Sequence, residues 1–277
     1  MKTLSENLQI DPAVAHRILV EFIHDEICRT GLSRAVIALS GGIDSALSCA
    51  LAAEALGPQN VLAICMPYAT STPASLADAR LVIQQTGVQS ETFEITEMVK
   101  PLIDGLPPNQ QKRAGNAMAR ARMIVLYDRS AGFNGLVVGT GNKTELLLGY
   151  TTLFGDSASA INPLGDLYKT QLRQLARHMQ LPAPVQQKAP SADLWIGQTD
   201  ETELGFTYER VDQLLYLLVD QRYQPDECIT AGFEPEFVRQ VIEQIRRNQF
   251  KRMLPTIAKL SNRTIGYDFL YLRDWGT

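Results

Sequence analysis

The chain has 277 residues, and its 26 lysines plus arginines against 30 aspartates plus glutamates give a formal net charge of −4. This balance excludes a basic nucleic-acid scaffold. The chain is 45% hydrophobic and 20% charged, which suits a buried core and excludes disordered or collagen-like classes. No run reaches the ~18 apolar residues of a membrane helix, and the polar start lacks a signal peptide's apolar run. We expect a soluble, cytoplasmic protein with neither membrane nor nucleic-acid partner.

Strands and helices alternate through the first half of the sequence. Apolar residues at helical spacing predict a helix from Asp11 to Arg29, with Asp11 as its N-cap and Pro12 in its first turn. Apolar runs predict strands over 35–39, 61–66, 91–95 and 135–140, with helices over 45–56, 75–86, 116–130 and 145–149. This alternation predicts an α/β fold, a parallel sheet with helices on both faces. Such sheets bind ligands at the carboxyl ends of their strands.

After about residue 160 the strand signals stop. Helices are predicted over 167–179, 206–220 and 235–254, and the last 23 residues show no clear period. Residues 181–205 are rich in proline, glycine and polar residues and too long for an ordinary connection, so we expect a lid. We predict one domain over 1–277, with an N-terminal helix (1–33), a core (34–160), the lid (181–205) and a helical C-terminal part (206–277).

The six residues from Ser40 to Ser45, with the sequence SGGIDS, lie where a predicted strand gives way to a helix. Glycines let the backbone approach an anion, and the N–H groups of a new helix point outward without partners. The helix end attracts an anion by only about 0.3–2 kcal/mol, too little to hold a triphosphate in water. Asp44 would repel phosphate unless a cation lay between them, and Mg²⁺ suits oxygen ligands of both kinds. The 34–160 core is therefore expected to bind nucleotide.

A purely structural interpretation of this loop also exists. Two glycines after a strand often form a simple turn, and Asp-Ser is a common helix start that caps backbone N–H groups. The full six-residue pattern is much more specific. Other nucleotide loops are not supported, because no GxxxxGK[ST] occurs and Thr144 stands where a GxGxxG fingerprint starting at Gly139 requires glycine.

The loop resembles that of ATP-dependent synthetases that split ATP between its α and β phosphates to adenylate a substrate. Three further segments resemble the motifs of the NAD synthetase family, in the same order and spacing from residue 35 to about 254: residues 139–156, Tyr168-Lys169-Thr170, and residues 192–212. The resemblance implies a Rossmann-like parallel sheet with C-terminal helical additions, usually in a homodimer. We expect that homodimer to bury the apolar residues of the 116–130 helix, namely Met118, Met123, Ile124 and Val125.

The resemblance also implies the residues of the nucleotide site. ATP, as co-substrate, is expected on Ala38, Leu39, Ser40, Gly41, Gly42, Ile43, Asp44, Ser45, Thr140, Lys169 and Ser191. Mg²⁺ is expected on Asp44 and Glu145, and Lys169 would neutralise charge on the breaking phosphoanhydride, which makes Asp44 and Lys169 the catalytic residues. The alternatives are that Glu145 only favours a helix dipole, that Lys169 is a solvated lysine, and that Ser191 is a turn residue.

For the dinucleotide substrate, the resemblance points to Arg120 and Lys251. The sequence departs from the common ammonia-dependent pattern at three positions: Leu153 stands for a lysine, Ala160 for an aspartate and Phe250 for a histidine. Residues 139–156 are closer to the glutamine-dependent members. These departures leave the expected adenylation site untouched.

The reaction implied is the amidation of deamido-NAD to NAD. The nicotinate carboxylate would attack the α phosphorus of ATP, pyrophosphate would leave, and ammonia would displace AMP. The expected partners are thus deamido-NAD, ATP and ammonia. Asp200 and Glu203 are candidates to orient or deprotonate the incoming ammonium.

Three alternatives remain at this stage. An RNA-modifying enzyme could use the same loop, although pI 5.5 and the lack of paired cysteines speak against it. A non-catalytic nucleotide-binding module would not need Glu145, Lys169 or a lid. Only 39 residues precede Ser40, too few for an amidase domain, so we expect free ammonia as donor; a separate glutaminase subunit is the remaining alternative.

Overall fold

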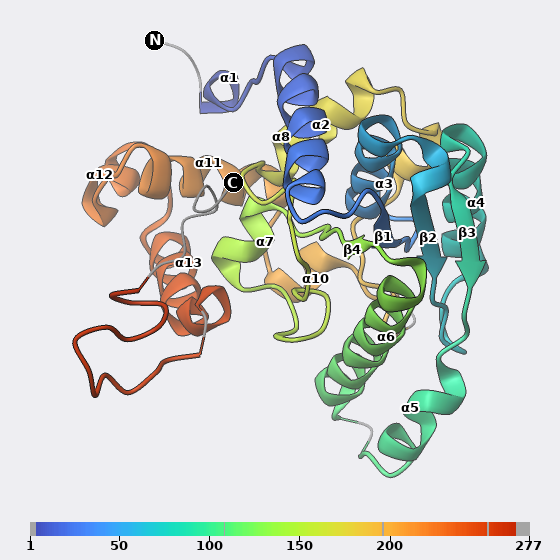
Figure 1. Cartoon of the computed structure of the whole chain (residues 1–277). Coiled ribbons are helices and arrows are strands. Elements are labelled where there is room, and N and C mark those ends of the chain that lie inside the picture. Colours follow the sequence, from blue (N-terminus) through green and yellow to red (C-terminus); the bar gives the residue numbers. More distant parts are fainter. Residues whose placement is uncertain (1–3, 108, 196, 254, 270–277) are drawn as a thin grey trace.

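A four-stranded parallel sheet forms the centre of the molecule (Figure 1). The computed structural model describes residues 4–107, 109–195, 197–253 and 255–269. The strand order is β3-β2-β1-β4, with bounds β1 Ala35–Ala38, β2 Val61–Cys65, β3 Gln89–Thr92 and β4 Leu136–Val137. Ala35 pairs with both Val61 and Leu136, so β1 lies inside the sheet. The predicted parallel α/β fold is confirmed.

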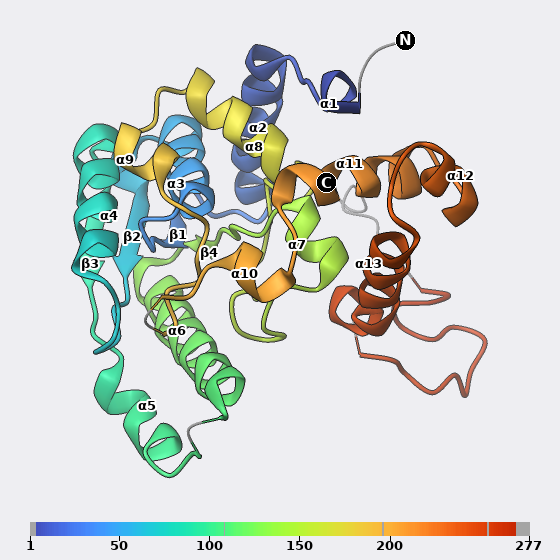
Figure 2. The ribbon, with the colours of Figure 1, turned by 180° about the vertical axis from the view of Figure 1, so that it is seen from behind.

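Helices cover both faces of this sheet (Figures 1 and 2). Successive side chains of a strand point to opposite faces. Ala35 and Ile37 accordingly join one apolar cluster, whereas Val36 joins another on the other face. The first cluster is built with α2 (Pro12–Cys28), α3 (Ile43–Leu56), α4 (Pro73–Thr86), α8 (Lys169–His178) and α9 (Ala183–Gln187). The second uses α5 (Thr96–Ile103) and α6 (Gln111–Phe133).

Most predicted elements of the first half are present with shifted ends. The Asp11 carboxylate accepts hydrogen bonds from the backbone N–H groups of Ala13 and Val14, as expected of the N-cap of α2. The third strand was predicted over 91–95 but spans 89–92, because its pairing with β2 begins at Gln89, which carries no apolar signal. The helix α5, the four-residue α1 (Leu4–Asn7) and the 3₁₀ turn η1 (Pro58–Asn60) were not predicted.

The C-terminal half packs a separate apolar cluster beside the sheet. It contains α7 (Lys143–Leu148), α10 (Asp200–Leu204), α11 (Tyr208–Leu215) with its π-helical extension η2 (Tyr216–Asp220), α12 (Pro225–Thr230) and α13 (Pro235–Arg247), followed by η3 (Gln249–Arg252). The single-domain assignment stays a prediction.

Two expectations for this half need correction. The 181–205 segment is not a continuous loop, because α9 and α10 lie within it, the latter started by the Thr199 hydroxyl accepting from the Thr202 N–H. The helical C-terminal part ends at Arg252, and described residues 255–269 form no regular helix or strand; the predicted helix end at residue 254 lies outside the described residues. Within the described chain, no helix has the length and apolar character needed to cross a membrane.

Candidate active site

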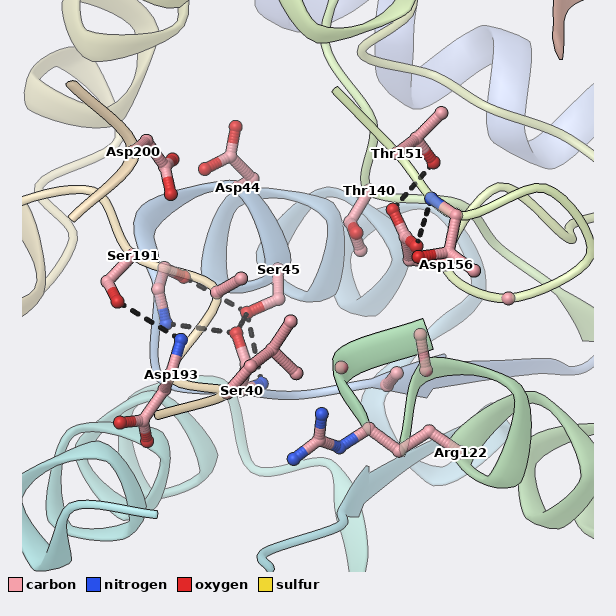
Figure 3. A pocket seen from close by; sticks show the side chains of 18 of the residues that line it. Ser40, Asp44, Ser45, Arg122, Thr140, Thr151, Asp156, Ser191, Asp193 and Asp200 are labelled. Carbon is pink, nitrogen blue, oxygen red and sulfur yellow. Dashed lines mark hydrogen bonds between the residues drawn. The ribbon is translucent and has the colours of Figure 1, made fainter. Parts of the chain in front are cut away.

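A cavity of about 810 Å³ opens at the carboxyl ends of β1, β2 and β4. Its wall comes from the loop after β1, the start of α4, one side of α6, the turn after β4 and residues 188–195. In the view of Figure 3, Asp44 and Asp200 lie at one side of the cavity, Thr151 and Asp156 at the other, and Ser45 between them. The volume is that of a small-molecule site, at the edge of the sheet where ligands bind in such folds.

The loop from Ser40 to Ser45 contributes most of its length to this cavity. Every residue from Ala38 to Ser45 lines it except Gly41. Gly41 has φ +78°, and a Cβ there would lie 2.1 Å from the Ser75 carbonyl oxygen, so only glycine fits. Gly42 is the N-cap of α3 and has no side chain to cap it, which leaves the N–H groups of the first turn of the helix beside the cavity. The Ser45 hydroxyl stabilises the turn by donating to the Gly42 carbonyl at 3.0 Å.

Lys169 lies between two carboxylates at the floor of this loop. Its Nζ is 2.5 Å from Asp44 Oδ2 and 3.6 Å from Glu145 Oε1, and its side chain is 1% exposed. Asn142 Nδ2 donates to the other Asp44 oxygen at 2.8 Å. The solvated-lysine interpretation is therefore wrong. Burial by itself would lower the pKa of Lys169, but the charges of Asp44 and Glu145 outweigh it and raise that pKa.

Glu145 has two structural roles at once. One of its oxygens accepts from the Asn142 N–H at 3.2 Å, while the Asn142 side chain accepts from the Glu145 N–H at 3.0 Å, which completes a capping box for α7. The other oxygen faces Lys169. Burial and the neighbouring Asp44 carboxylate raise the pKa of Glu145 to about 8, and Lys169 opposes that rise only in part. The alternative that Glu145 serves only the start of its helix is thus incomplete, because Glu145 caps α7 and also faces Lys169 in the charged cluster.

Two carboxylates that share a single ammonium fit a further cation. Asp44 and Glu145 offer hard oxygen donors, the kind that Mg²⁺ prefers. Burial and then the Asp44 charge raise the pKa of Glu145, and a cation between the two carboxylates would oppose both causes. Among the described residues there is no group of three or more histidines, cysteines or acids placed to hold a metal ion. A cation here would need phosphate or water oxygens to complete its coordination.

Asp212, on α11, holds the first turns of α7 and α8 together. Its buried carboxylate accepts from the Thr144 hydroxyl at 2.6 Å and from the Thr170 N–H at 2.8 Å, and Thr144 Oγ1 in turn accepts from the Lys169 N–H. Burial raises the pKa of Asp212. These bonds fix the backbone that carries Glu145 and Lys169. Asp212 is not among the residues predicted from the sequence; its only signal was an acid within the apolar pattern of the 206–220 helix.

The two acids proposed for the incoming ammonium lie in one hydrogen-bonded group. The Tyr150 hydroxyl lies 3.2 Å from Asp200 Oδ1 and 2.9 Å from Glu203 Oε2, and the Tyr208 hydroxyl donates to Asp200 Oδ2 at 3.0 Å. Both acids line the cavity. Burial raises the pKa of Asp200, and the Lys169 charge opposes that rise. Asp200 is buried whereas Glu203 is partly exposed, so Asp200 is the better shielded of the two.

Three of the remaining predicted residues line the cavity and one does not. Thr140 and Ser191 line the cavity, and Ser191 also makes the turn bond of the alternative interpretation, because its hydroxyl accepts from the Asp193 N–H. Lys251 lines it too, with Nζ donating to the carbonyls of Gly149 and Thr151. Arg120 does not line it; its Nε donates to the Leu153 carbonyl on the outer side of α6.

Sequence reasoning missed the arginine that does face the cavity. Arg122 lines the wall and donates from Nε to the Met66 carbonyl at 3.0 Å; burial lowers its pKa. Two residues along a helix are about 200° apart, so Arg120 and Arg122 cannot face the same side. Which of the two arginines faces the cavity depends on how α6 is rotated about its axis relative to the sheet, and that rotation selects Arg122. Asp156 was missed as well, although it lines the cavity and accepts from the Thr151 hydroxyl at 2.6 Å.

Together, the parallel sheet, the glycine loop at a helix start and the buried lysine between two carboxylates define an α/β protein with a nucleotide-type anion site. The sequence model of the family described as NAD synthase matches residues 15–255. The chain belongs to the NAD synthase family, and the resemblance deduced from its motifs is confirmed.

Individual relatives agree with this assignment. The chain is 58% identical over 269 residues to the NH(3)-dependent NAD(+) synthetase of Trichlorobacter lovleyi, covering 97% of this chain and 98% of the relative. It is 56% identical to that of Chlorobium phaeobacteroides strain BS1, covering 97% of each. Among solved structures, the NMN synthetase of Francisella tularensis has a TM-score of 0.80 at 31% identity (90% of this chain, 99% of that one). The NH3-dependent NAD synthetase of Campylobacter jejuni has a TM-score of 0.77 at 32% identity (90% and 100%).

Proposed function

We propose that this protein is a ligase that amidates deamido-NAD to NAD at the expense of ATP, with ammonia as the nitrogen donor. AMP and pyrophosphate are the other products. The observation that carries this proposal is the buried Lys169, held between Asp44 and Glu145 directly beside the anion loop. A simple nucleotide-binding module has no need of such a costly buried charge cluster. Family membership and the names of the relatives support the same reaction.

In the first half-reaction, an oxygen of the nicotinate carboxylate bonds to the α phosphorus and the bond from that phosphorus to pyrophosphate breaks. The N–H groups at the start of α3 bind phosphate oxygens, and Lys169 stabilises the negative charge that develops on the leaving pyrophosphate. A Mg²⁺ held by Asp44 and Glu145 would supply further charge neutralisation. Thr140, Ser191 and the lid segment then enclose the nucleotide and keep water from the acyl-adenylate.

In the second half-reaction, ammonia bonds to the acyl carbon and the bond from that carbon to AMP breaks. Ammonium must lose one proton to become a nucleophile, and the attacking nitrogen must lose another. Asp200 is the proposed acceptor of the first proton, because it lines the cavity and two tyrosine hydroxyls hold its carboxylate in place. Glu203, which also lines the cavity and contacts the Tyr150 hydroxyl, is the proposed acceptor of the second. Lys251 and Arg120 remain the proposed dinucleotide contacts, with Arg120 acting outside the cavity described above.

A second substrate is also a candidate to be amidated at this site. One of the solved structures with the same fold is an NMN synthetase. Of the positions expected at the dinucleotide, only Lys251 lines the cavity, whereas Arg120, Leu153, Ala160 and Phe250 do not. The mononucleotide that corresponds to deamido-NAD is therefore the second candidate substrate.

We expect the purified chain to form AMP and pyrophosphate from ATP with Mg²⁺ and ammonium chloride only when deamido-NAD is added. Parallel reactions contain nicotinate mononucleotide or no acceptor, and chromatography quantifies NAD, NMN and AMP. Ammonia-free glutamine in place of ammonium serves as the control and should give no amide product. AMP formation without any acceptor, or NMN formation faster than NAD formation, would contradict the proposed substrate.

The proposal extends to a homodimer formed through α5 and α6. Met118 and Val125 are buried within their own chain and Met123 lines the cavity, so only Ile124 of the four expected residues is free for a partner. Ile124 (56% exposed) is accompanied by Tyr127 on the same helix and by Leu102 (64% exposed) on the adjoining α5. These exposed apolar side chains support a self-association surface. The cytoplasmic location stays a prediction.

Sedimentation at micromolar concentration should therefore show a dimer, and Ile124→Glu should convert it to a monomer because a charge would be buried without a partner. Ile18→Glu is the matched control, since Ile18 is 55% exposed on α2 on the other side of the sheet. A wild-type monomer, or a dimer lost only in the control variant, argues against this surface.

A further inference from the structure

The starts of α7 and α8 are joined to each other by hydrogen bonds. The Lys143 N–H donates to the Leu167 carbonyl at 2.9 Å, and the Lys169 N–H donates to the Thr144 hydroxyl oxygen at 3.0 Å. Lys169 is the first residue of α8, and Glu145 lies in the first turn of α7. The contact between their side chains therefore depends on how firmly these two helix starts are held.

Asp220 holds both helix starts, as Asp212 does. Asp220 is the last residue of η2, and its Oδ1 accepts from Nζ of Lys143, the first residue of α7, at 2.8 Å. Its Oδ2 accepts from the hydroxyl of Tyr168, the N-cap of α8, at 2.9 Å. Asp212 likewise takes one bond from each helix start. Each carboxylate thus joins α7 to α8, and α11 packs beside both helices (Figures 1 and 2).

A π-helical turn brings Asp220 to the same face as Asp212. Successive residues of an α-helix are rotated by about 100°, so the eighth residue after Asp212 would lie about 80° away around the axis. The residues of η2 instead form a π-helical turn, in which the Gln221 N–H donates to the Tyr216 carbonyl at 3.0 Å. Such a turn takes up one extra residue. Asp220 therefore has the direction of a seventh residue, within about 20° of Asp212.

The contacts of Asp220 lie next to the catalytic lysine in the sequence. The Asp220 side chain is 30% exposed, and its ion pair with Lys143 is one of the surface pairs that contribute little to stability. Tyr168, by contrast, is buried, and its ring lies 4.7 Å from Lys143 Nζ. Because Tyr168 directly precedes Lys169, its position sets the direction in which the Lys169 side chain reaches the floor of the cavity.

We propose that Asp212 and Asp220 form a two-carboxylate clamp that sets Lys169 and Glu145 in place for the adenylation step. The inference rests on the proposed function for the reaction that the clamp affects, whereas the clamp itself is a feature of the fold. Neither of its two acids lines the cavity. Both are positioning residues, because they act through the helix starts and do not touch substrate. Lys169 Nζ has to meet Asp44 as well as Glu145, so a small displacement of its helix start weakens both contacts.

Loosening the clamp should lower kcat more than it raises the KM for ATP. Lys169 is proposed to stabilise negative charge that develops on the leaving pyrophosphate, so its displacement is felt mainly in the transition state. The N–H groups at the start of α3, which are proposed to bind the phosphates, are not part of the clamp. We expect Asp220→Ala to lower kcat by about tenfold and to change the KM for ATP by less than about twofold.

The first test is steady-state NAD formation from deamido-NAD, ATP, Mg²⁺ and ammonium chloride. Asp220→Asn retains one acceptor oxygen and should recover part of kcat. Adding Tyr168→Phe to Asp220→Ala should lower kcat by less than a further twofold or so, because the same hydrogen bond is already lost. Asp226→Ala is the matched control, since Asp226 is an exposed acid in the first turn of α12 and has no part in the clamp. A kcat of Asp220→Ala equal to that of the control, or a loss confined to KM, overturns the proposed effect on the reaction.

The second test is hydrogen exchange of the full chain, which needs no turnover. Asp220→Ala should lower the protection of backbone amides in residues 143–146 and 169–170 by about tenfold, and Asp226→Ala should leave it unchanged. Urea unfolding of Asp220→Ala should have nearly the wild-type midpoint, because an exposed ion pair contributes little.

Two results of the exchange experiment would contradict the clamp. Unchanged protection of these amides in Asp220→Ala would show that the carboxylate does not hold the helix starts, and an equal loss of protection throughout the chain would show general destabilisation instead. A wild-type protein that forms no NAD would contradict the proposed function, while the exchange experiment still decides whether the clamp exists.

Discussion

Replacing Lys169 by methionine should lower turnover by at least about 10³-fold and also destabilise the protein. The activity loss follows from removing preorganised positive charge where negative charge develops, an effect of about 10²–10³ for one donor and larger for a full charge. Destabilisation follows because Asp44 and Glu145 would lose their shared ammonium. Breaking a buried pair costs about 3–5 kcal/mol, but Glu145 can keep a proton, so we expect about 2–4 kcal/mol.

Asp44→Asn is the informative contrast to this variant. It should lose activity to a similar extent, yet its free energy of unfolding should fall less. Removing the Asp44 charge lowers the pKa of Glu145, so that Glu145 at 3.6 Å can become the counter-ion of Lys169. Lys100→Met, an exposed lysine at the end of α5, controls for the substitution itself. Steady-state assays and urea unfolding of the four proteins measure both effects. A Lys169→Met protein that unfolds like the wild type would show that the cluster is not the tight ion pair described here.

The free energy of unfolding of the ligand-free protein should fall as pH rises from about 4.5 to 8. Glu145 has a raised pKa of about 8 in the folded chain against an ordinary value of 4.5. Between these values the folded state holds a proton that the unfolded state has released, so raising the pH favours unfolding. This contribution is fully present below about 4.5 and is lost as pH rises through 8. At about 1.4 kcal/mol per pKa unit, its upper limit is about 4–5 kcal/mol.

The measurement is urea unfolding at several pH values for wild type and Glu145→Gln. Other groups also contribute to the pH dependence, among them Asp200, whose pKa is raised by burial. The difference between the two proteins isolates the Glu145 contribution, and Glu97→Gln, at an exposed acid in the first turn of α5, should retain the wild-type pH slope. Parallel slopes in wild type and Glu145→Gln would mean that Glu145 is ionised throughout. Cation binding at Asp44 and Glu145 should become stronger as the pH rises, because Glu145 must lose its proton before its carboxylate can bind a cation.

Local signals were enough to predict the fold and the position of the site. Alternating strands and helices, the Asp11 cap and the glycine loop at 40–45 depend on hydrogen bonds and periodicities within a few residues, and such patterns can be read along the chain. The carboxyl ends of parallel strands share one edge, so loops at 40–45 and 139–145 could be expected to meet there. Motif resemblance added Lys169 and Ser191, which also line the cavity.

Only the tertiary structure decided how these residues act on one another. Burial of Lys169 between Asp44 and Glu145 joins separate parts of the chain, with Lys169 and Asp44 lying 125 positions apart. Burial raises the pKa of Glu145, whereas the charges of the two acids outweigh burial and raise the pKa of Lys169. The choice between Arg120 and Arg122 depended on how α6 is rotated against the sheet, which apolar spacing did not resolve. Ser75 carries no local pattern, and the only signal of Asp212 was an acid within the apolar pattern of a helix. Their importance comes from packing, which places a carbonyl against Gly41 in one case and two helix starts around a single carboxylate in the other.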